Sequence, residues 1–425
     1  MLAVLLGTFT LRFSTGLTGG LLVFYLRDLC VDPFALAVFT ATFFAAELLL
    51  SAPFGLLSDR LGHHRIMQVG PLFGAIAVVM TWATTDLFTI GITRFLEGAS
   101  TAASVPSILG FIAMATAGNE LMRGRASARF EGATLAGLGV GITAAGLLYD
   151  GIPGVAGGLG RNAFLLNAVI YGVSFLIYRV GVSPPAAESR SLDAPHYGWR
   201  RYLQLLTASS VWLLAPTWIA INAALGLWTS QAVFQLIREP VPEFADQLLM
   251  GGFGGAQIAL GLGVGLIVFF AGLAYWGERF KNMRRTTIIL YGIIGGAASV
   301  AAAIAINHSA GLPDLVRLGA GLIAAAGVFV LAGATPAALG LLADVSEAYP
   351  ADRGAIMGLY SVFLAVGQII GGFIGADAAN RAGIDGILIA TLVLLAVAIL
   401  PLARLRRFEH EVGVAAKPEV APGTT

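Results

Sequence analysis

Residues 55–65 read Gly55-Leu-Leu-Ser-Asp59-Arg60-Leu-Gly62-His-His-Arg65 and separate two long apolar blocks. A hydrocarbon core of ~30 Å is crossed by about 20 apolar residues in a helix, so each block is long enough to span a membrane. Long apolar blocks and short polar breaks then alternate along the rest of the chain. This pattern predicts an all-α membrane protein in which residues 55–65 connect two spanning helices.

The composition excludes several other classes of protein. Of 425 residues, 57% are hydrophobic and 12% are charged, whereas soluble proteins carry about 25% charged residues. A soluble enzyme is therefore nearly excluded, and a barrel would show alternating segments of ~10 residues instead. The net charge of +1 argues against a nucleic-acid partner. A single cysteine, Cys30, and five scattered histidines predict neither a metal site nor a cofactor.

The apolar blocks predict twelve membrane spans. The first is not a signal peptide, because it is too long and carries Arg12 in its middle. The expected spans are 2–26, 34–57, 66–85, 87–117, 130–149, 162–182, 208–237, 248–276, 286–306, 315–342, 355–375 and 386–402.

Lysine and arginine predict the orientation, because they are enriched in cytoplasmic loops. With both termini inside, 18 of them fall in inner segments and 5 in outer loops. We therefore expect a multi-pass protein of the inner (plasma) membrane with cytoplasmic termini. The five expected outer residues are Arg27, Arg161, Arg238, Arg317 and Arg381.

The two halves of the chain echo each other. The acid–arginine pair Asp59-Arg60 recurs as Glu278-Arg279, 219 residues later. Six-plus-six repeats of this kind are common in transporters, with the binding site at the repeat interface. We expect two pseudo-symmetric six-helix bundles, 1–182 and 208–402, a cytoplasmic linker, 183–207, and a disordered tail, 403–425.

The pattern Gly55-x-x-x-Asp59-Arg60-x-Gly62-x-x-Arg65 resembles the signature loop between helices 2 and 3 of the major facilitator superfamily of secondary transporters. Arg94-x-x-Glu97-Gly98 is similar to a second motif of that family, often found in proton-coupled members. The resemblance covers about residues 1–407. It implies the fold of that family, alternating access, and a cavity surrounded by spans 1, 4, 7 and 10.

The chain also resembles a third motif of that family, but less closely. Gly137-x-x-x-Gly141-Ile142-x-x-Ala145-Gly146 is similar to a motif typical of antiporters, but Ile142 replaces the expected proline and Ala145 one of the paired glycines. Glycine patterns at 137–141 and 261–265 also superficially resemble nucleotide-binding loops. No strand precedes them, so close helix packing is the better interpretation.

The signature loop predicts a conformational latch on the cytoplasmic side. Asp59 would face a helix N-terminus, while Arg60 and Arg65 would pair with acids, at roughly 1–2 kcal/mol per contact. Gly55 and Gly62 permit close approach and a tight turn. Glu278 and Arg279 are the degenerate copy. The alternative is that the arginines of this loop only reflect the general enrichment of positive charge in cytoplasmic loops. Candidate partners are Gly354, Glu120 and Glu347.

Four ionisable residues stand out because they lie well inside the expected spans: Arg12, Glu47, Arg94 and Glu97. A charge at mid-bilayer costs about 2.5–3.5 kcal/mol on insertion scales, so each indicates a functional site. Arg94 and Glu97 share a helix face, and Arg12 and Glu47 lie at similar depth. A carboxylate that exchanges its arginine for a proton would couple transport to the proton gradient. Glu47 and Glu97 are the candidates and Glu131 a weaker third; the alternative is a static paired network.

The second half offers polarity without mid-span charge, as an amphipathic or aromatic substrate requires. Pro216 and Pro336 are positioned to kink two of its spans. The weakly indicated cavity residues are Trp218, Asn222, Gln231, Gln257, Tyr360 and Gln368. Interfacial anchoring and helix bridging are the alternatives for each of them.

The sequence thus predicts a monomeric transporter, not an enzyme, that moves a small organic solute through the lipid bilayer. Proton-coupled efflux of amphipathic compounds is the favoured function, with small molecules and protons as partners. The first alternative is a facilitator or symporter for a hydrophilic metabolite such as a sugar. The second is a non-transporting membrane assembly factor on the same scaffold.

Overall fold

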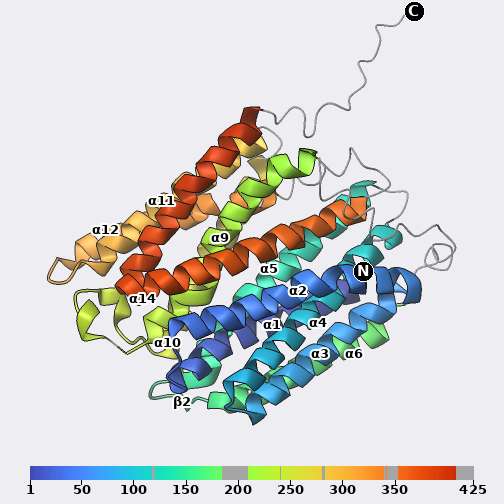
Figure 1. The fold of residues 1–425 in the computed structure, drawn as a ribbon, viewed down its shortest axis with the longest axis horizontal. Helices are drawn as coiled ribbons and strands as arrows, with labels where there is room; N and C mark the ends of the chain where they lie inside the picture. Colours follow the sequence, from blue (N-terminus) through green and yellow to red (C-terminus); the bar gives the residue numbers. More distant parts are fainter. Residues whose placement is uncertain are drawn as a thin grey trace, which may run out of the picture. The chain divides into compact units, whose positions relative to one another are not determined.

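The computed structural model describes residues 1–116, 120–183, 209–239, 241–279, 283–338, 341 and 353–407. Within these ranges, eleven helices are long and apolar enough to cross a membrane, which confirms the all-α membrane class. The expected linker from Pro184 onward and the tail beyond Arg407 lie outside the described residues. The helices (Figure 1) are α1 Leu2–Asp28, α2 Pro33–Leu61, α3 His63–Ala83, α4 Leu87–Ala115, α5 Glu120–Asp150, α6 Ala163–Gly181, α9 Ser209–Ile237, α10 Gly255–Arg279, α11 Arg285–Asn307, α12 Asp314–Leu331 and α14 Arg353–Arg407.

Helix α14 contains two of the expected spans. Its backbone leaves the helical region at Ala382 and Gly383, where the glycine has φ 59°. Gly386 packs so closely on the carbonyl oxygen of Ala378 that a side chain there would collide with it. The chain therefore reverses at this point (Figure 1), and α14 accounts for spans 355–375 and 386–402.

Several helices begin or end away from the expected boundaries. Helix α5 starts ten residues before the expected span, at Glu120, because a helix continues past the hydrocarbon into polar sequence. Helix α10 starts later than expected, at Gly255, because a 3-10 turn over Leu248–Met250 and Gly252 with φ 62° precede it. Helix α14 runs to Arg407, with Leu405 buried.

The described helices form two compact units. The first comprises Met1–Pro195, Gly226–Leu266 and Ile369–Ile387, so it joins α1–α6 to the end of α9, the start of α10 and the turn of α14. The second comprises His196–Leu225, Ile267–Gln368 and Leu388–Thr425. Each has its own core, around Leu21 and Phe164 in the first and around Ile289 and Leu405 in the second.

Small residues set the packing of α1 against α5 in the first unit. A Cβ on Gly137 would lie 2.6 Å from the Phe9 carbonyl oxygen, and one on Gly141 would collide with the Phe13 carbonyl oxygen. Gly16 of α1 makes the reciprocal approach to α5. Small residues let helix backbones approach closely in membranes. The glycines of the antiporter-like pattern are thus part of a helix-packing seam.

Local capping determines where α2, α3 and α4 begin. Asp32 and Asp86 accept hydrogen bonds of 2.8 Å from the N–H groups of Ala35 and Thr89. The Thr89 hydroxyl and backbone N–H hold the pKa of the Asp86 carboxyl below its usual range, because both donate to the charged form. Between α2 and α3, Gly62 has φ 98°, a conformation that favours glycine.

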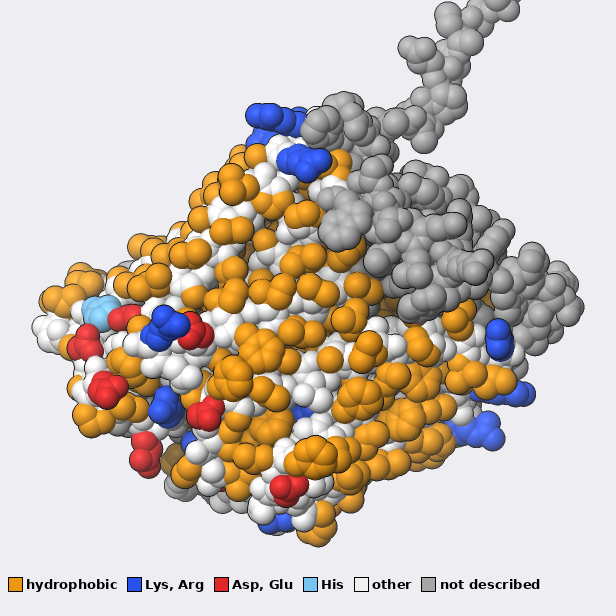
Figure 2. Space-filling view, in the orientation of Figure 1, with side chains coloured by type: hydrophobic (Ala, Val, Ile, Leu, Met, Phe, Trp, Pro, Cys, Tyr) orange, Lys and Arg blue, Asp and Glu red, His pale blue; other side chains and the backbone are white. Residues whose placement is uncertain are grey.

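The single sheet of the described part is a two-stranded hairpin between α5 and α6. It pairs β1, Gly151–Ile152, with β2, Ala156–Gly157, in antiparallel register. On the face seen in Figure 2, hydrophobic side chains cover the helices, and charged side chains gather toward the helix ends. This distribution is that of helices whose middle portions contact lipid.

Candidate functional site

The structure pairs Arg94 with Glu97, as their spacing on α4 predicts. Arg94 Nη1 donates to Glu97 Oε2 in a buried ion pair. The Glu97 side chain also accepts a 3.2 Å hydrogen bond from the Tyr171 hydroxyl of α6, and Thr18 of α1 lies close to it. With 1% of its surface exposed, Glu97 is enclosed by α1, α4 and α6.

The Arg94 side chain is fixed from a second side. Its guanidinium lies 4.8 Å from the centre of the Phe43 ring of α2, a cation–π distance. Gly98, one helical turn further on, allows α4 to touch the Phe43 backbone. The Arg94 Nε atom has no hydrogen-bond partner in the described part of the chain. This ion pair is therefore held by α2 as well as by α1 and α6.

Glu47 has a different environment. Its side chain is 7% exposed, yet it has no ion pair within 4 Å to any described residue. Arg12, which is half-buried on α1, attracts Glu47 electrostatically and also attracts Glu131 of α5. The expected Arg12–Glu47 pairing is thus a longer-range attraction in which two carboxylates share one arginine.

The signature loop is described except for the Asp59 side chain, which lies outside the described residues. Arg60 and Arg65 are exposed at the ends of α2 and α3. Gly62 forms the tight turn between the helices, and its N–H donates to Ser58 O at 2.9 Å. A Cβ on Gly55 would make an ordinary 3.8 Å contact with Pro106. The proposed acidic partners Glu120 and Glu347 also have no described side chains.

The copy of this motif in the second half ends α10. Glu278 and Arg279 are both exposed. The Arg279 guanidinium lies 5.0 Å from the centre of the Tyr275 ring, which is one turn away on the same helix. In the described part of the second unit, this arginine is held by an aromatic ring and not by an acid.

The expected polar residues of the second half are found in several places. Trp218, Asn222 and Gln368 are buried in the second unit, and Asn222 Nδ2 donates to Trp218 O at 2.9 Å. Gln257 is exposed, and its Oε1 accepts from Gly254 N at 2.9 Å, so it caps α10. The Tyr360 side chain lies outside the described residues.

Gln231 belongs to the first unit instead. Its Nε2 donates to the backbone oxygen of Pro33, the first residue of α2, at 2.9 Å. Its Oε1 atom, and both amide atoms of the buried Gln235 one turn later, have no partner in the described ranges. Sequence patterns indicated Gln231 as a polar residue, but its contact with α2 needed the structure.

A proline does accompany a break in the tenth expected span. Helix α12 ends at Leu331, Ala332 and Gly333 form a turn, and a helical segment over 334–338 carries Pro336. Pro216 lies within α9.

The sequence analysis missed a charged cluster at the expected outer end of the first unit. Arg27 of α1 forms ion pairs with Asp28 and with Asp150, the last residue of α5. The Tyr149 hydroxyl donates to Asp28 at 2.7 Å. The sequence places Arg27 in an expected outer loop, and 123 residues separate it from Asp150, so spacing does not indicate this pair.

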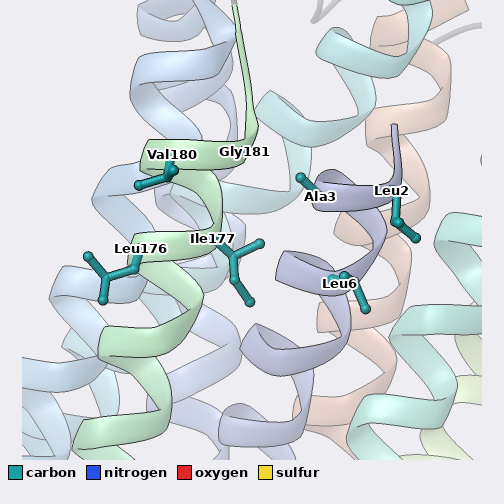
Figure 3. Close-up of a pocket in the computed structure, with 7 residues that line it drawn as sticks. All are labelled: Leu2, Ala3, Leu6, Leu176, Ile177, Val180 and Gly181. Atoms are coloured by element: carbon teal, nitrogen blue, oxygen red, sulfur yellow. The ribbon is translucent and has the colours of Figure 1, made fainter.

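The groove in Figure 3 is a poor candidate for a solute site. It lies between the start of α1 and the end of α6, and its lining is apolar throughout. A solute site normally adds a few convergent polar groups to an apolar lining. The lining residues are Leu2, Ala3, Leu6, Leu176, Ile177, Val180 and Gly181.

The described helices and buried charges define a multi-pass membrane protein, and its family is shown by comparison. The profile of the Major Facilitator Superfamily matches residues 4–312. The chain belongs to the Major Facilitator Superfamily and is a transporter of that family, not an enzyme. The resemblance found in the sequence is therefore confirmed.

Curated relatives match over a limited segment. The multi-drug resistance efflux pump PmrA from two strains of Streptococcus pneumoniae is 24% identical over 119 residues. That segment is 27% of this chain and 30% of the length of those relatives.

Solved structures match over nearly the whole chain. The crystal structure of the nucleoside transporter NupG has a TM-score of 0.68 at 14% identity, covering 96% of this chain and 98% of that one. A mutant of NupG gives the same TM-score and covers 95% of this chain and all of that one. At this identity the likeness shows the fold alone.

Proposed function

We propose that the chain exports amphipathic compounds in exchange for protons, and that Glu47 carries the proton. The observation that carries this proposal is the burial of Glu47 without an ion pair to any described residue. The charge of Arg12 acts on both Glu47 and Glu131. One arginine balances only one carboxylate. In a low-dielectric interior the extra carboxylate is costly unless it takes up a proton or faces another cation.

Glu47 suits this role better than Glu97. Glu97 is ion-paired with Arg94 and hydrogen-bonded to Tyr171, so protonation would break the ion pair and weaken the hydrogen bond. Removing one partner of a buried ion pair typically costs 3–5 kcal/mol. Among the described residues, Glu47 has only the shared attraction of Arg12. We therefore assign the Arg94–Glu97 pair a structural role and Glu47 the exchangeable proton.

The substrate class rests on the second unit. Among the described residues of this unit, the buried polar groups are uncharged, and Trp218, Asn222 and Gln368 combine aromatic surface with amide groups. Side chains of this kind suit amphipathic molecules with an aromatic part. The partial match to a multi-drug efflux pump supports the same class.

The alternative is import of a hydrophilic metabolite. The buried amides of Asn222 and Gln368 favour it, because amide groups hydrogen-bond hydroxyl-rich solutes. The fold shared with a nucleoside transporter is compatible with it.

We further propose that the signature loop acts as a cytoplasmic latch between conformations. Asp59 is the proposed anion, and the exposed guanidinium groups of Arg60 and Arg65 are available for acidic partners. Gly62 holds the tight turn that presents these side chains. In the second half of the chain, Glu278 and Arg279 form the degenerate copy of this motif and would make the corresponding latch contacts.

Transport in proteoliposomes tests the proposal. Vesicles that are acidic inside should accumulate the amphipathic dye ethidium, and their internal pH should rise as they do so. Glu47→Gln should abolish gradient-driven accumulation while still exchanging dye down its own gradient. The matched variant Glu97→Gln should lower stability but retain proton coupling.

Other outcomes would overturn it. If Glu47→Gln keeps full gradient-driven transport, Glu47 does not carry the proton. If the vesicles ignore ethidium but take up uridine or glucose when the outside is acidic, the symport alternative is correct. The efflux function is contradicted if vesicles with the wild-type protein take up none of these probes faster than vesicles without protein.

A further inference from the structure

The charged cluster missed by sequence analysis joins two halves of the chain within the first unit. Arg27 of α1 binds Asp150 with both terminal nitrogens, Nη2 to Oδ1 at 3.0 Å and Nη1 to Oδ2 at 3.2 Å. The same Oδ2 atom accepts a 2.9 Å hydrogen bond from the backbone N–H of Gly255, the first residue of α10. One carboxylate therefore links α1 and α5 to the N-terminus of α10.

The helix backbones touch beside this carboxylate. A Cβ on Gly146 would collide with the carbonyl oxygen of Gly255, and a Cβ on Gly255 would collide with that of Gly146. Two turns further along α10, a Cβ on Gly263 would lie 3.6 Å from the Thr143 methyl group. The contact of α5 with α10 is thus tight, and it excludes any side chain at its centre.

The linkage is favourable on physical grounds. A carboxylate at a helix N-terminus is stabilised by the helix dipole and by a free N–H group. A bidentate arginine–carboxylate pair adds directional strength. Arg27 is itself held in place by Asp28, through Nε at 3.0 Å, and by the Phe24 ring. Asp28 has no contact with α10 among those described, so it forms part of the support and not of the link.

A second contact accompanies the first. Gln231 of α9 donates to Pro33 O of α2, but its Oε1 atom and both amide atoms of Gln235 are buried without a partner in the described ranges. Buried polar atoms without partners are unfavourable. Water would satisfy these atoms if the contact opened, so their burial offsets part of the stability of the closed contact.

We propose that Asp150 is a clasp that holds α10 against α5 on the expected outer side, and that the clasp opens and closes once in each transport cycle. This rests on the proposed alternating-access function. The outer clasp acts between the two halves of the chain, as the proposed cytoplasmic latch would act on the other side. Closure requires the Asp150 side chain, Arg27 in place and glycine at positions 146 and 255.

Cross-linking measures the closed contact without any substrate. In a Cys30→Ser background, Thr143→Cys and Gly263→Cys would be joined by a short bifunctional thiol reagent. Asp150→Ala should slow cross-linking roughly three- to tenfold, the range expected when a helix cap is lost. Asp314→Ala, which removes an exposed acid that pairs with a different arginine, Arg317, should leave the rate within about twofold.

A second pair of variants guards against misfolding. Gly255→Ala should slow cross-linking because its methyl group meets the Gly146 carbonyl, whereas Gly261→Ala on the same helix meets nothing within 4 Å and should not. Equal rates for Asp150→Ala and the background, or equal slowing by Asp314→Ala, would overturn the clasp. Cross-linking needs no solute, so it is independent of transport. If the cross-linking rates change as expected but the protein transports no probe, the proposed function is refuted and the Asp150 contact is not.

Discussion

Tyr171 is the residue that ties the buried ion pair to a neighbouring helix. Its hydroxyl donates to Glu97 at 3.2 Å, and both side chains are fully enclosed. Tyr178, two turns later on α6, is equally buried, but its hydroxyl is 3.5 Å from Thr8 Oγ1. The two tyrosines thus differ in the charge and distance of their partner and in little else.

Tyr171→Phe should lower the free energy of unfolding by about 1.5 kcal/mol, because it removes a hydrogen bond to a charged group. Tyr178→Phe should have a much smaller effect, because its hydroxyl makes a long contact with a neutral partner. Thermal unfolding in detergent measures both. Equal losses of stability would mean that the Tyr171 hydroxyl does not support the Glu97 carboxylate.

Sequence patterns identified the side chains at this scale better than their partners. Arg94 and Glu97 are three residues apart on one helix, so their pairing followed from spacing alone. Tyr171 is 74 residues from Glu97 and Asp150 is 123 from Arg27. Nothing in a single sequence indicates which of many distant polar residues will meet, so the support of Glu97 and the outer clasp required the structure.

The α1–α5 seam offers the clearest test at the scale of elements. A methyl group on Gly141 would collide with the Phe13 carbonyl, whereas Gly132 of the same helix has nothing within 4 Å. Gly141→Ala should therefore destabilise the protein by roughly 1–3 kcal/mol, as overpacking does. Gly132→Ala should be neutral or stabilising by about 0.4–1 kcal/mol, because alanine restricts the unfolded chain.

The measurement is the apparent Tm of each purified variant in the same detergent. If Gly141→Ala unfolds at the same temperature as Gly132→Ala, the seam is not limited by the glycine backbone contact.

Element boundaries were harder to predict than the elements. Block length located the helices, because each crossing needs a run of apolar residues. It gave no information where helix and hydrocarbon end at different places, as at the start of α5. The late start of α10 depends on backbone conformation at Gly252, which hydropathy does not report.

At the scale of the whole molecule, Cys30 tests the orientation. It is exposed in the turn between α1 and α2, on the expected outer side. Since it is the single cysteine, a membrane-impermeant maleimide should label the wild-type protein in intact cells. A Cys30→Ser, Leu61→Cys variant, with its thiol in the expected cytoplasmic turn, should be labelled only after the cells are permeabilised.

The reverse pattern of labelling would invert the orientation and place the proposed clasp inside. Cys30→Ser without a new cysteine should remain unlabelled throughout.

The family and the helical class were predicted from the sequence. Both depend on local features, the length of the hydrophobic blocks and a specific loop motif, which can be recognised within short stretches of the chain. The segments Gly226–Leu266 and Ile369–Ile387 belong to the same compact unit as Met1–Pro195. Such packing depends on contacts between distant segments, which neither composition nor repeats specify.

Three helices, α9, α10 and α14, each begin in one compact unit and continue in the other. Contacts within the first unit therefore join the two halves of the chain in addition to the covalent link between residues 183 and 209. Two separately encoded polypeptides, ending at Ser183 and starting at Ser209, would still present Gly146 to Gly255 and Gln231 to Pro33. When the two fragments are co-expressed in one membrane, they should associate through these contacts and copurify.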